Sequence, residues 1–240
     1  MNLKNNKILI TGGASGIGKG LAERFLKDGN TIIVCGRRNE VLEELKQKHP
    51  SIITKVCDLS VESKRIELLE WVKENHPDLN VLVNNAGIQN WMSIEEDDFF
   101  IRAKNELAVN VEAPIHLTAL FIKLRSLSTI INVTSGLSFC PLTKVSVYSA
   151  TKAFFHSFTL SMQEVLKIKN IEVIELIPPA INTDLGGKGI HDDAPPVHEL
   201  IDAVFNQLAD GKKTLTFGMS DKLSNASADE LKLIFERMNK

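Results

Sequence analysis

The chain has 240 residues, 43% of them hydrophobic, and a formal net charge of −2 at pH 7. A chain of this length can bury a large core within one α/β domain. The near-neutral charge offers no polybasic surface to nucleic acid or to an anionic membrane, and no apolar segment is long enough to span a bilayer. The N-terminus lacks the hydrophobic region of a secretory leader. We therefore expect a soluble, cytoplasmic protein with no nucleic-acid or membrane partner.

Short apolar segments alternate with amphipathic segments along the whole chain. The apolar segments are rich in Val and Ile without polar alternation, which is typical of strands buried on both faces. They cover residues 7–11, 31–35, 52–57, 80–83, 129–134, 171–177 and 214–217. Helices are expected over residues 16–28, 39–48, 62–75, 97–124, 146–168, 196–209 and 227–238. This order predicts right-handed crossovers and an α/β, Rossmann-type, doubly wound parallel sheet of about seven strands with helices on both faces. No linker or repeat interrupts it, so residues 1–240 are expected to form a single domain.

The first expected strand leads into a glycine-rich turn, TGGASGIG, over residues 11–18. Glycines allow a tight turn and a close backbone approach to a pyrophosphate, which binds at the N-terminus of the following helix. The spacing is Gly-x3-Gly-x-Gly rather than Gly-x-Gly-x2-Gly, but the strand–turn–helix context is the one that dinucleotides require. The residues expected to bind the cofactor here are Gly12, Ser15, Gly16, Ile17 and Gly18.

The second expected strand ends in Gly36-Arg37-Arg38, with no acidic residue. In dinucleotide folds an acid at this place binds a free ribose 2'-hydroxyl, whereas arginine accommodates a 2'-phosphate. We therefore predict that NADP(H) is preferred, with NAD(H) possible, and that Arg37 is the main reason. Arg38 can assist. The alternative, a solvent-exposed basic residue at the start of the next helix, fits Arg38 better than Arg37.

The three cysteines, Cys35, Cys57 and Cys140, lie far apart and in no metal-binding spacing. We interpret them as reduced thiols. The run His191-Asp192-Asp193 could suggest a metal, but we interpret it as solvated loop charge and expect no metal site.

Tyr148, the only tyrosine, precedes Lys152 by four residues in an expected helix, so both side chains share one face. A nearby cation favours the phenolate of a group whose pKa is otherwise about 10, which suits acid–base catalysis. Ser135 follows the fifth expected strand at its carboxyl end, where α/β active sites lie. Ser138 is an alternative, but the spacing to Tyr148 favours Ser135. Asn110 lies within the long helical stretch upstream.

With Asn84-Asn85-Ala86-Gly87 after the fourth strand, these motifs stand in an order that resembles the short-chain dehydrogenase/reductase superfamily, in its short single-domain branch, over essentially the whole chain. The resemblance implies an NAD(P)-dependent oxidoreductase. It implies that Tyr148 is the general acid/base and that Lys152 modulates it and binds the nicotinamide ribose. Ser135 then orients the substrate oxygen, and Asn110 holds a water through its backbone.

The same resemblance implies further cofactor contacts and an assembly. By this likeness Asp58 and Leu59 flank the adenine, Asn85, Ala86 and Gly87 line the cofactor, and Ile181 and Thr183 meet the carboxamide. A homodimer or homotetramer is expected, with the apolar faces of 97–124 and 146–168 at its interface. A closer likeness is to bacterial members found near cell-wall D-alanylation genes, which does not identify a substrate.

One position departs from the family pattern, which usually has Pro-Gly after the sixth strand. This chain reads Pro178-Pro179-Ala180, and proline fixes φ and removes a donor, so the loop on the nicotinamide side can differ in shape. The loop over residues 182–196 carries three glycines and is expected to be an active-site lid. A disordered surface connection is the alternative.

The expected substrate pocket is largely apolar, and its residues are Ile88, Gln89, Asn90, Trp91, Leu137, Phe139, Leu142, Ala180 and Leu185. It indicates hydride transfer between NADPH and a small or medium, largely apolar carbonyl or alcohol. The alternative is an NADP(H)-binding regulatory protein with little turnover. Sugar epimerisation belongs to longer relatives with a separate substrate domain. His116 and His156 are interpreted as core or interface histidines.

Overall fold

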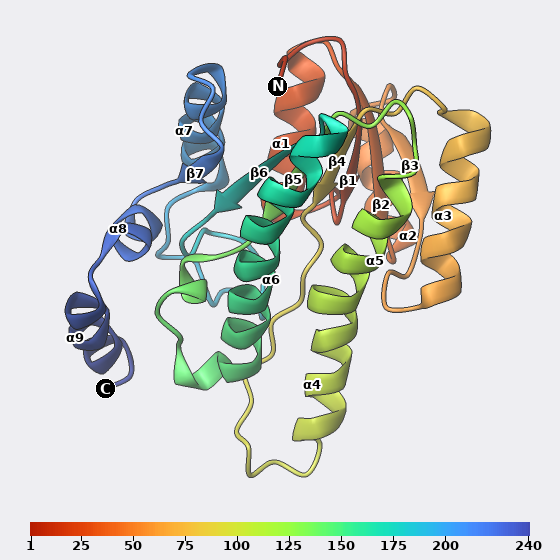
Figure 1. Ribbon diagram of the computed structural model, residues 1–240. Helices are drawn as coiled ribbons and strands as arrows, with labels where there is room; N and C mark the ends of the chain where they lie inside the picture. The colour runs from red at the N-terminus through yellow and green to blue at the C-terminus, as the bar shows by residue number, and fades with distance from the viewer.

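The computed structural model describes residues 1–240 and contains one seven-stranded parallel sheet (Figure 1). The strands are β1 (Lys7–Thr11), β2 (Thr31–Gly36), β3 (Ile53–Val56), β4 (Val81–Asn84), β5 (Thr129–Val133), β6 (Glu172–Ile177) and β7 (Thr214–Thr216). Their order in the sheet is β3-β2-β1-β4-β5-β6-β7, and every neighbouring pair is parallel. The predicted Rossmann-type fold is confirmed. The order reverses beside β1, and there the carboxyl ends of β1 and β4 open the crevice in which such sheets bind ligands.

Helices cover both faces of this sheet, because alternate residues of the buried strands point to opposite sides. The helices are α1 (Gly16–Lys27), α2 (Asn39–Lys48), α3 (Glu62–Asn75), α4 (Phe99–Leu107), α5 (Ala113–Phe121), α6 (Ser146–Val165), α7 (Val197–Ala209), α8 (Met219–Asn225) and α9 (Ala228–Met238). Ile8 and Ile10 pack with residues of α1, α2 and α7 in one core. Leu9, between them, packs with residues of α3 and α5 in the other.

The long helix expected over residues 97–124 is broken into two, which corrects that prediction. Between α4 and α5 the chain forms a π-helical turn, η1 (Ala108–Glu112), with Asn110 at its centre. Pro114 has no N–H to donate to the carbonyl of Asn110 four residues earlier, so the regular α-helical ladder cannot continue there. The interruption therefore frees the backbone of a residue that the sequence marks as functional.

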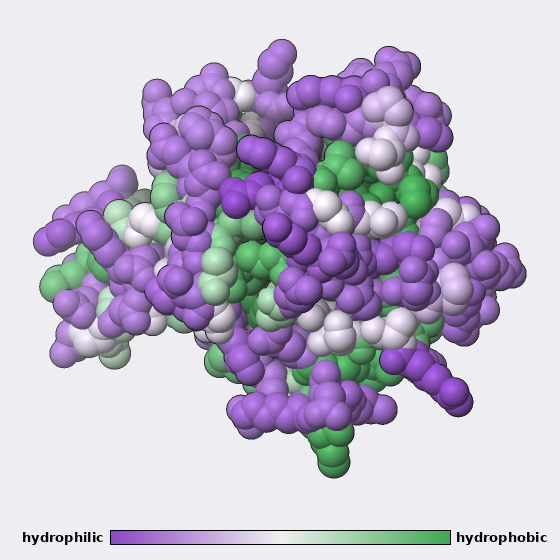
Figure 2. All heavy atoms as spheres, turned by 90° about the horizontal axis from the view of Figure 1, so that it is seen from above, coloured by the Kyte–Doolittle hydropathy of each residue, from purple (hydrophilic) through white to green (hydrophobic).

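The C-terminal part contains one helix, α8, that the sequence did not predict. It has only seven residues, which is too short to show an apolar period, yet Ser220 and Leu223 are buried. Helices α8 and α9 lie to one side of the sheet, with the C-terminus at their end (Figure 1). None of the helices is long and apolar enough to cross a membrane. The face seen in Figure 2 is covered mostly by hydrophilic residues.

Candidate active site

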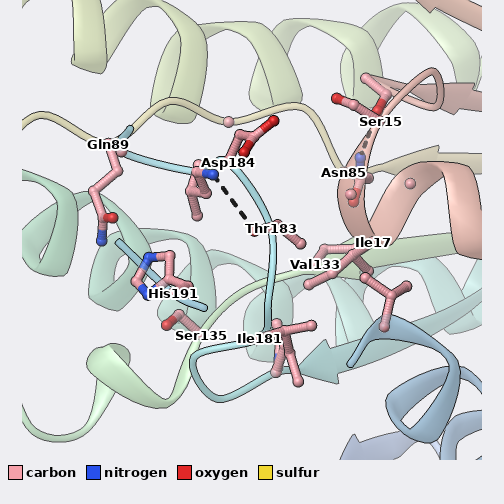
Figure 3. Close-up of a pocket in the computed structure, with 18 of the residues that line it drawn as sticks. Ser15, Ile17, Asn85, Gln89, Val133, Ser135, Ile181, Thr183, Asp184 and His191 are labelled. Atoms are coloured by element: carbon pink, nitrogen blue, oxygen red, sulfur yellow. Dashed lines mark hydrogen bonds between the residues drawn. The ribbon is translucent and has the colours of Figure 1, made fainter. Parts of the chain in front are cut away.

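A cavity of about 1660 Å³ opens at the carboxyl ends of the strands. Its lining includes the glycine turn after β1, the end of β2, the segment 85–91 after β4, the segment 133–137 after β5 and the segment 178–186 after β6. Figure 3 shows Ser15 and Asn85 on one side of this cavity and Gln89 and His191 on the other. We call these the cofactor side and the substrate side.

The glycine turn has the shape and the free donors that a pyrophosphate needs. Gly12 and Gly16 have φ of +63° and +52°, which side chains disfavour. A Cβ on Gly18 would lie 2.5 Å from the carbonyl oxygen of Gly12 and would also strike the Asn85 amide. The side chain of Ser15 does not cap α1, and no acidic residue stands in its first turn, so the first N–H groups remain available to an anion. The turn therefore fits a dinucleotide.

The segment after β4 holds the turn in place. The Thr11 hydroxyl accepts the N–H groups of Asn85 at 2.9 Å and Ala86 at 3.0 Å. The Asn85 side-chain amide donates to the carbonyls of Thr11 at 2.9 Å and Gly12 at 3.2 Å. Thr11 is thus a supporting residue that sequence reasoning read only as part of a motif. Asn85, Ala86 and Gly87 line the cavity as expected.

Arginines lie at the end of the cavity beyond β2. Arg37 and Arg38 line it and also a neighbouring hollow of about 650 Å³, and neither forms an ion pair with an acidic residue. The Asp58 carboxylate accepts the Ser60 hydroxyl at 2.7 Å, and this bond, with a smaller contribution from Arg37, lowers the pKa of Asp58. Leu59 lies beside it in the lining. Both guanidinium groups therefore remain available to a ligand.

Tyr148 and Lys152 meet on one face of α6, and both are buried. The Lys152 ammonium donates to the carbonyl of Val133 at 2.8 Å and lies 5.6 Å from the centre of the Tyr148 ring. Burial lowers the pKa of Lys152 to about 8. Burial also raises the pKa of Tyr148 well above its usual value; the Ser135 hydroxyl opposes this rise and the Glu106 carboxyl adds to it. Burial, rather than the expected effect of the lysine cation, dominates the phenol here.

Ser135 is presented directly after β5, and its hydroxyl accepts the N–H of Leu137 at 3.1 Å. Ser135 lines the cavity, whereas the alternative, Ser138, does not. The geometry thus brings Ser135 together with Tyr148 and Lys152 at one edge of the sheet, where a substrate oxygen can meet a hydroxyl and a phenol at once.

Asn110 ties the π-helical turn to the segment after β4. Its side chain accepts the N–H of Ile88 at 2.9 Å and donates to the carbonyl of Ile88 at 2.8 Å. It also donates to the Thr151 hydroxyl of α6 at 3.2 Å. The Asn110 side chain is thus fully engaged with the protein, so the water-holding role that the family resemblance implies can fall only to its backbone.

The segment after β6, which carries the second proline, is bonded to the segment after β5. The carbonyl of Pro178 accepts the N–H of Gly136 at 3.0 Å, which links it to the Ser135 segment. Thr183 faces the glycine turn, 3.3 Å from the position of a Cβ on Gly16. Ile181 is 3% exposed and packs mainly in the core. Its side chain is therefore not free to contact a carboxamide, and only its backbone can make the contact that was expected.

The expected substrate pocket needs two corrections. Phe139 does not line the cavity: its ring centre lies 4.6 Å from that of His156, against α6. His156 in turn bonds the buried Glu175 carboxylate at 2.8 Å. His191, which was not among the expected pocket residues, also lines the cavity, because the loop 182–196 runs along it. The other eight expected pocket residues line the cavity.

Glu106 is the buried group that sequence reasoning missed. It is fully buried in α4 and accepts the N–H of Asn90 at 3.1 Å. Burial raises the pKa of its carboxyl to about 7, while the Asn90 bonds and the Arg102 cation oppose the rise. No local pattern in the sequence distinguishes it from the exposed polar residues of the same helix.

Comparisons with known proteins agree with this geometry. A sequence profile described as short chain dehydrogenase matches residues 6–193. The uncharacterized oxidoreductase DltE of Bacillus subtilis is 40% identical, covering 100% of this chain and 98% of that protein. The very-long-chain 3-oxoacyl-CoA reductase of Mus musculus is 30% identical over 74% of this chain, which spans only 60% of that protein.

Solved structures share the fold. A short chain dehydrogenase from Burkholderia cenocepacia in complex with NADP superposes with a TM-score of 0.86 at 24% identity, covering 100% of both chains. A short-chain dehydrogenase from Sphingobium yanoikuyae in complex with NADPH gives 0.77 at 23% identity, covering 97% of this chain and 93% of that one.

Proposed function

Because this chain belongs to the short-chain dehydrogenase/reductase family and is thus an NAD(P)-dependent oxidoreductase, we propose that it is an NADPH-preferring reductase of small or medium, largely apolar carbonyl compounds. The observation that carries the proposal is the convergence of Ser135, Tyr148 and Lys152 on one cavity with the glycine turn. We further propose that residues 1–240 act as one catalytic domain.

The bound cofactor supplies the hydride, and the residues of the chain supply the proton and the orientation. Ser135 donates a hydrogen bond to the carbonyl oxygen and holds it beside the Tyr148 phenol. The phenol gives its proton to that oxygen as negative charge develops on it. Burial keeps the phenol protonated, which suits an acid in the reductive direction. Lys152 and Asn110 return a proton to the phenol from solvent.

The preference for NADPH rests on the end of the cavity beyond β2. Arg37 and Arg38 line it and form no ion pair, although Arg37 is close enough to Asp58 to lower its pKa. A guanidinium offers paired donors to a phosphate and stays charged at every working pH. Neighbours of the same fold are described in complex with NADP, with NADPH and with NADH, so the preference rests on the two arginines.

We also propose a homodimer or homotetramer. Helices α4 and α6 expose large apolar side chains, among them Phe100 and Ile101 at 72% each, Phe154 at 44% and Leu160 at 45%. Surfaces of this kind mark protein interfaces. Light scattering on the purified protein tests the assembly, and a monomer at all concentrations would contradict it.

The reductase proposal is tested by NADPH oxidation across a panel of aldehydes, ketones and quinones, followed by absorbance. We expect turnover with at least one class and tighter binding of NADPH than of NADH. Tight NADPH binding without turnover of any compound would instead support a regulatory protein.

A further inference from the structure

Seven buried side-chain polar atoms in the chain have no hydrogen-bond partner within the protein, and four of them cluster on the substrate side. These four are Gln89 Oε1, Asn90 Nδ2, Trp91 Nε1 and Glu106 Oε2. Native proteins pair nearly all such atoms, because a buried donor or acceptor left alone is costly. The Asn90 side chain acts on the Glu106 carboxyl, whose pKa it lowers, so Gln89 Oε1 and Trp91 Nε1 are the two atoms that indicate a partner outside the protein.

The backbone of this loop is fixed from below, so its side chains are held in position. Ile88 exchanges two hydrogen bonds with the Asn110 side chain, at 2.9 and 2.8 Å. The N–H of Asn90 donates to Glu106 at 3.1 Å, and the Arg102 guanidinium donates to the carbonyl of Trp91. All three anchors belong to α4 or η1. A loop held in this way loses little conformational freedom when it binds a ligand.

Gln89 and Trp91 converge on one point beneath the lid. A Cβ placed on Gly186 would lie 2.5 Å from Gln89 Oε1 and 2.9 Å from Trp91 Nε1. The first atom is an acceptor and the second a donor. Gly186 has a φ of +82° and carries no side chain, so the lid backbone lies directly against both atoms, and a ligand group reaches them when the lid moves aside. Figure 3 shows Gln89 in the same cavity as Ser135 and His191.

We propose that Gln89 and Trp91 form a hydroxyl-binding subsite, so that the substrate is a carbonyl compound that also carries a hydroxyl group. The hydroxyl donates its proton to Gln89 Oε1 and accepts from the indole N–H of Trp91. One hydroxyl satisfies both atoms, whereas a second carbonyl or a carboxylate could accept from Trp91 but would leave Gln89 unpaired. This inference rests on the proposed reductase function and narrows its otherwise apolar substrate class.

The matched pair 4-hydroxy-2-butanone and 2-pentanone tests the subsite, since they differ only by a hydroxyl in place of a methyl group. We expect kcat/KM to favour the hydroxyketone by at least about tenfold, the value of one well-made hydrogen bond at a buried site. Gln89→Met and Trp91→Phe should each reduce this ratio several-fold. Gln163→Met, which makes the same change at a glutamine that does not line the cavity, should leave the ratio as it is.

Calorimetric titration of the NADP⁺-bound enzyme with 1,3-butanediol and 2-pentanol provides a readout that needs no turnover. We expect the diol to bind at least about tenfold more tightly, and the preference to shrink in Gln89→Met. If both ketones are reduced equally well and both alcohols bind equally, the subsite is wrong and the reductase function stands. If neither ketone is reduced but the diol is still preferred through Gln89, the subsite stands and the reductase function is wrong. Failure of both binding and turnover overturns both.

Discussion

The two sides of the cavity differ in how their polar groups are satisfied. On the cofactor side, Thr11 and Asn85 bond each other's segments four times, so the glycine turn is complete before any ligand arrives. On the substrate side, the side chains of Gln89 and Trp91 each end in a polar atom without a protein partner. The cofactor side is thus stabilised by its own hydrogen bonds. On the substrate side we propose that the Gln89 and Trp91 side chains find their hydrogen-bond partner in a ligand. Each prediction below tests one side of this contrast.

The largest effect is expected where the two sides meet. Replacing Tyr148 by Phe removes the proton donor while the ring still fills its buried place. We expect kcat to fall by at least about 100-fold, the low end of what general acid–base catalysis contributes. The Kd for NADPH should change little, because the turn and Arg37 remain. Retained turnover in the purified variant would rule out Tyr148 as the acid.

On the cofactor side, Arg37→Ala should abolish most of the preference for NADPH over NADH. One or two charge-assisted bonds to a phosphate, about 1.5–3 kcal/mol each, correspond to a preference of about ten- to several-hundred-fold. Fluorescence titration of both cofactors measures it. Arg38→Ala serves as the comparison and should have a smaller effect. A wild type that binds NADH as tightly as NADPH would leave Arg37 without this role.

Because the glycine turn on the cofactor side is tightly packed, we expect that it cannot accept a larger side chain without a loss of stability. Gly18→Ala would place a methyl group 2.5 Å from the Gly12 carbonyl oxygen, and we expect a loss of about 1–3 kcal/mol in unfolding free energy and weaker NADPH binding. The matched control is Gly36→Ala, whose methyl group would meet only Leu42 at 3.9 Å. Urea unfolding distinguishes them, and equal stability of the two variants would contradict the packing described.

On the substrate side, the buried Glu106 should make stability depend on pH. Its folded-state pKa of about 7 lies above the ordinary value of 4.5, so the folded state binds this proton more tightly. The stability that it contributes is full below about pH 4.5 and is lost as the pH rises through 7. The free energy of unfolding of Glu106→Gln, measured relative to that of the wild type, should therefore rise by about 1–3 kcal/mol as the pH goes from 5 to 8. Urea unfolding at a series of pH values measures this. If the unfolding free energies of the wild type and the variant change with pH in parallel, the pKa of Glu106 is not raised in the folded state.

The smallest effect concerns the lid. Gly186, Gly187 and Gly189 all have positive φ, and we expect residues 184–194 to exchange amide hydrogens more slowly when cofactor and substrate are bound. Hydrogen exchange with NADP⁺ and 1,3-butanediol measures this. No change in exchange at saturating ligand would contradict a lid that closes over the ligands.

The cofactor side of the cavity could be predicted from the sequence more fully than the substrate side. The parallel, doubly wound sheet follows from the alternation of apolar strands and amphipathic helices, and the glycine turn follows from a backbone shape that only glycine allows at position 18. The break in the helix at Asn110 depends on Pro114, and its signal was present but was outweighed by the apolar pattern around it.

The substrate side could not be predicted to the same depth. Whether Phe139 points into the cavity or against His156 depends on how a short loop packs on α6. In the sequence Glu106 has the pattern of a polar residue on an amphipathic helix. It is buried because the loop 88–92 packs over it in the folded protein. These are tertiary properties, and no local pattern encodes them.

The central claim is that this chain moves a hydride from NADPH to a carbonyl carbon with Tyr148 as the proton donor. The most direct measurement uses NADPH carrying deuterium at both positions of the nicotinamide C4, 4-hydroxy-2-butanone as substrate, and mass spectrometry of the product. The account predicts 1,3-butanediol with one deuterium on the former carbonyl carbon from the wild type, and at least about 100-fold slower labelling from Tyr148→Phe. Tight NADPH binding with no deuterium in this product or in that of any other carbonyl compound would contradict it.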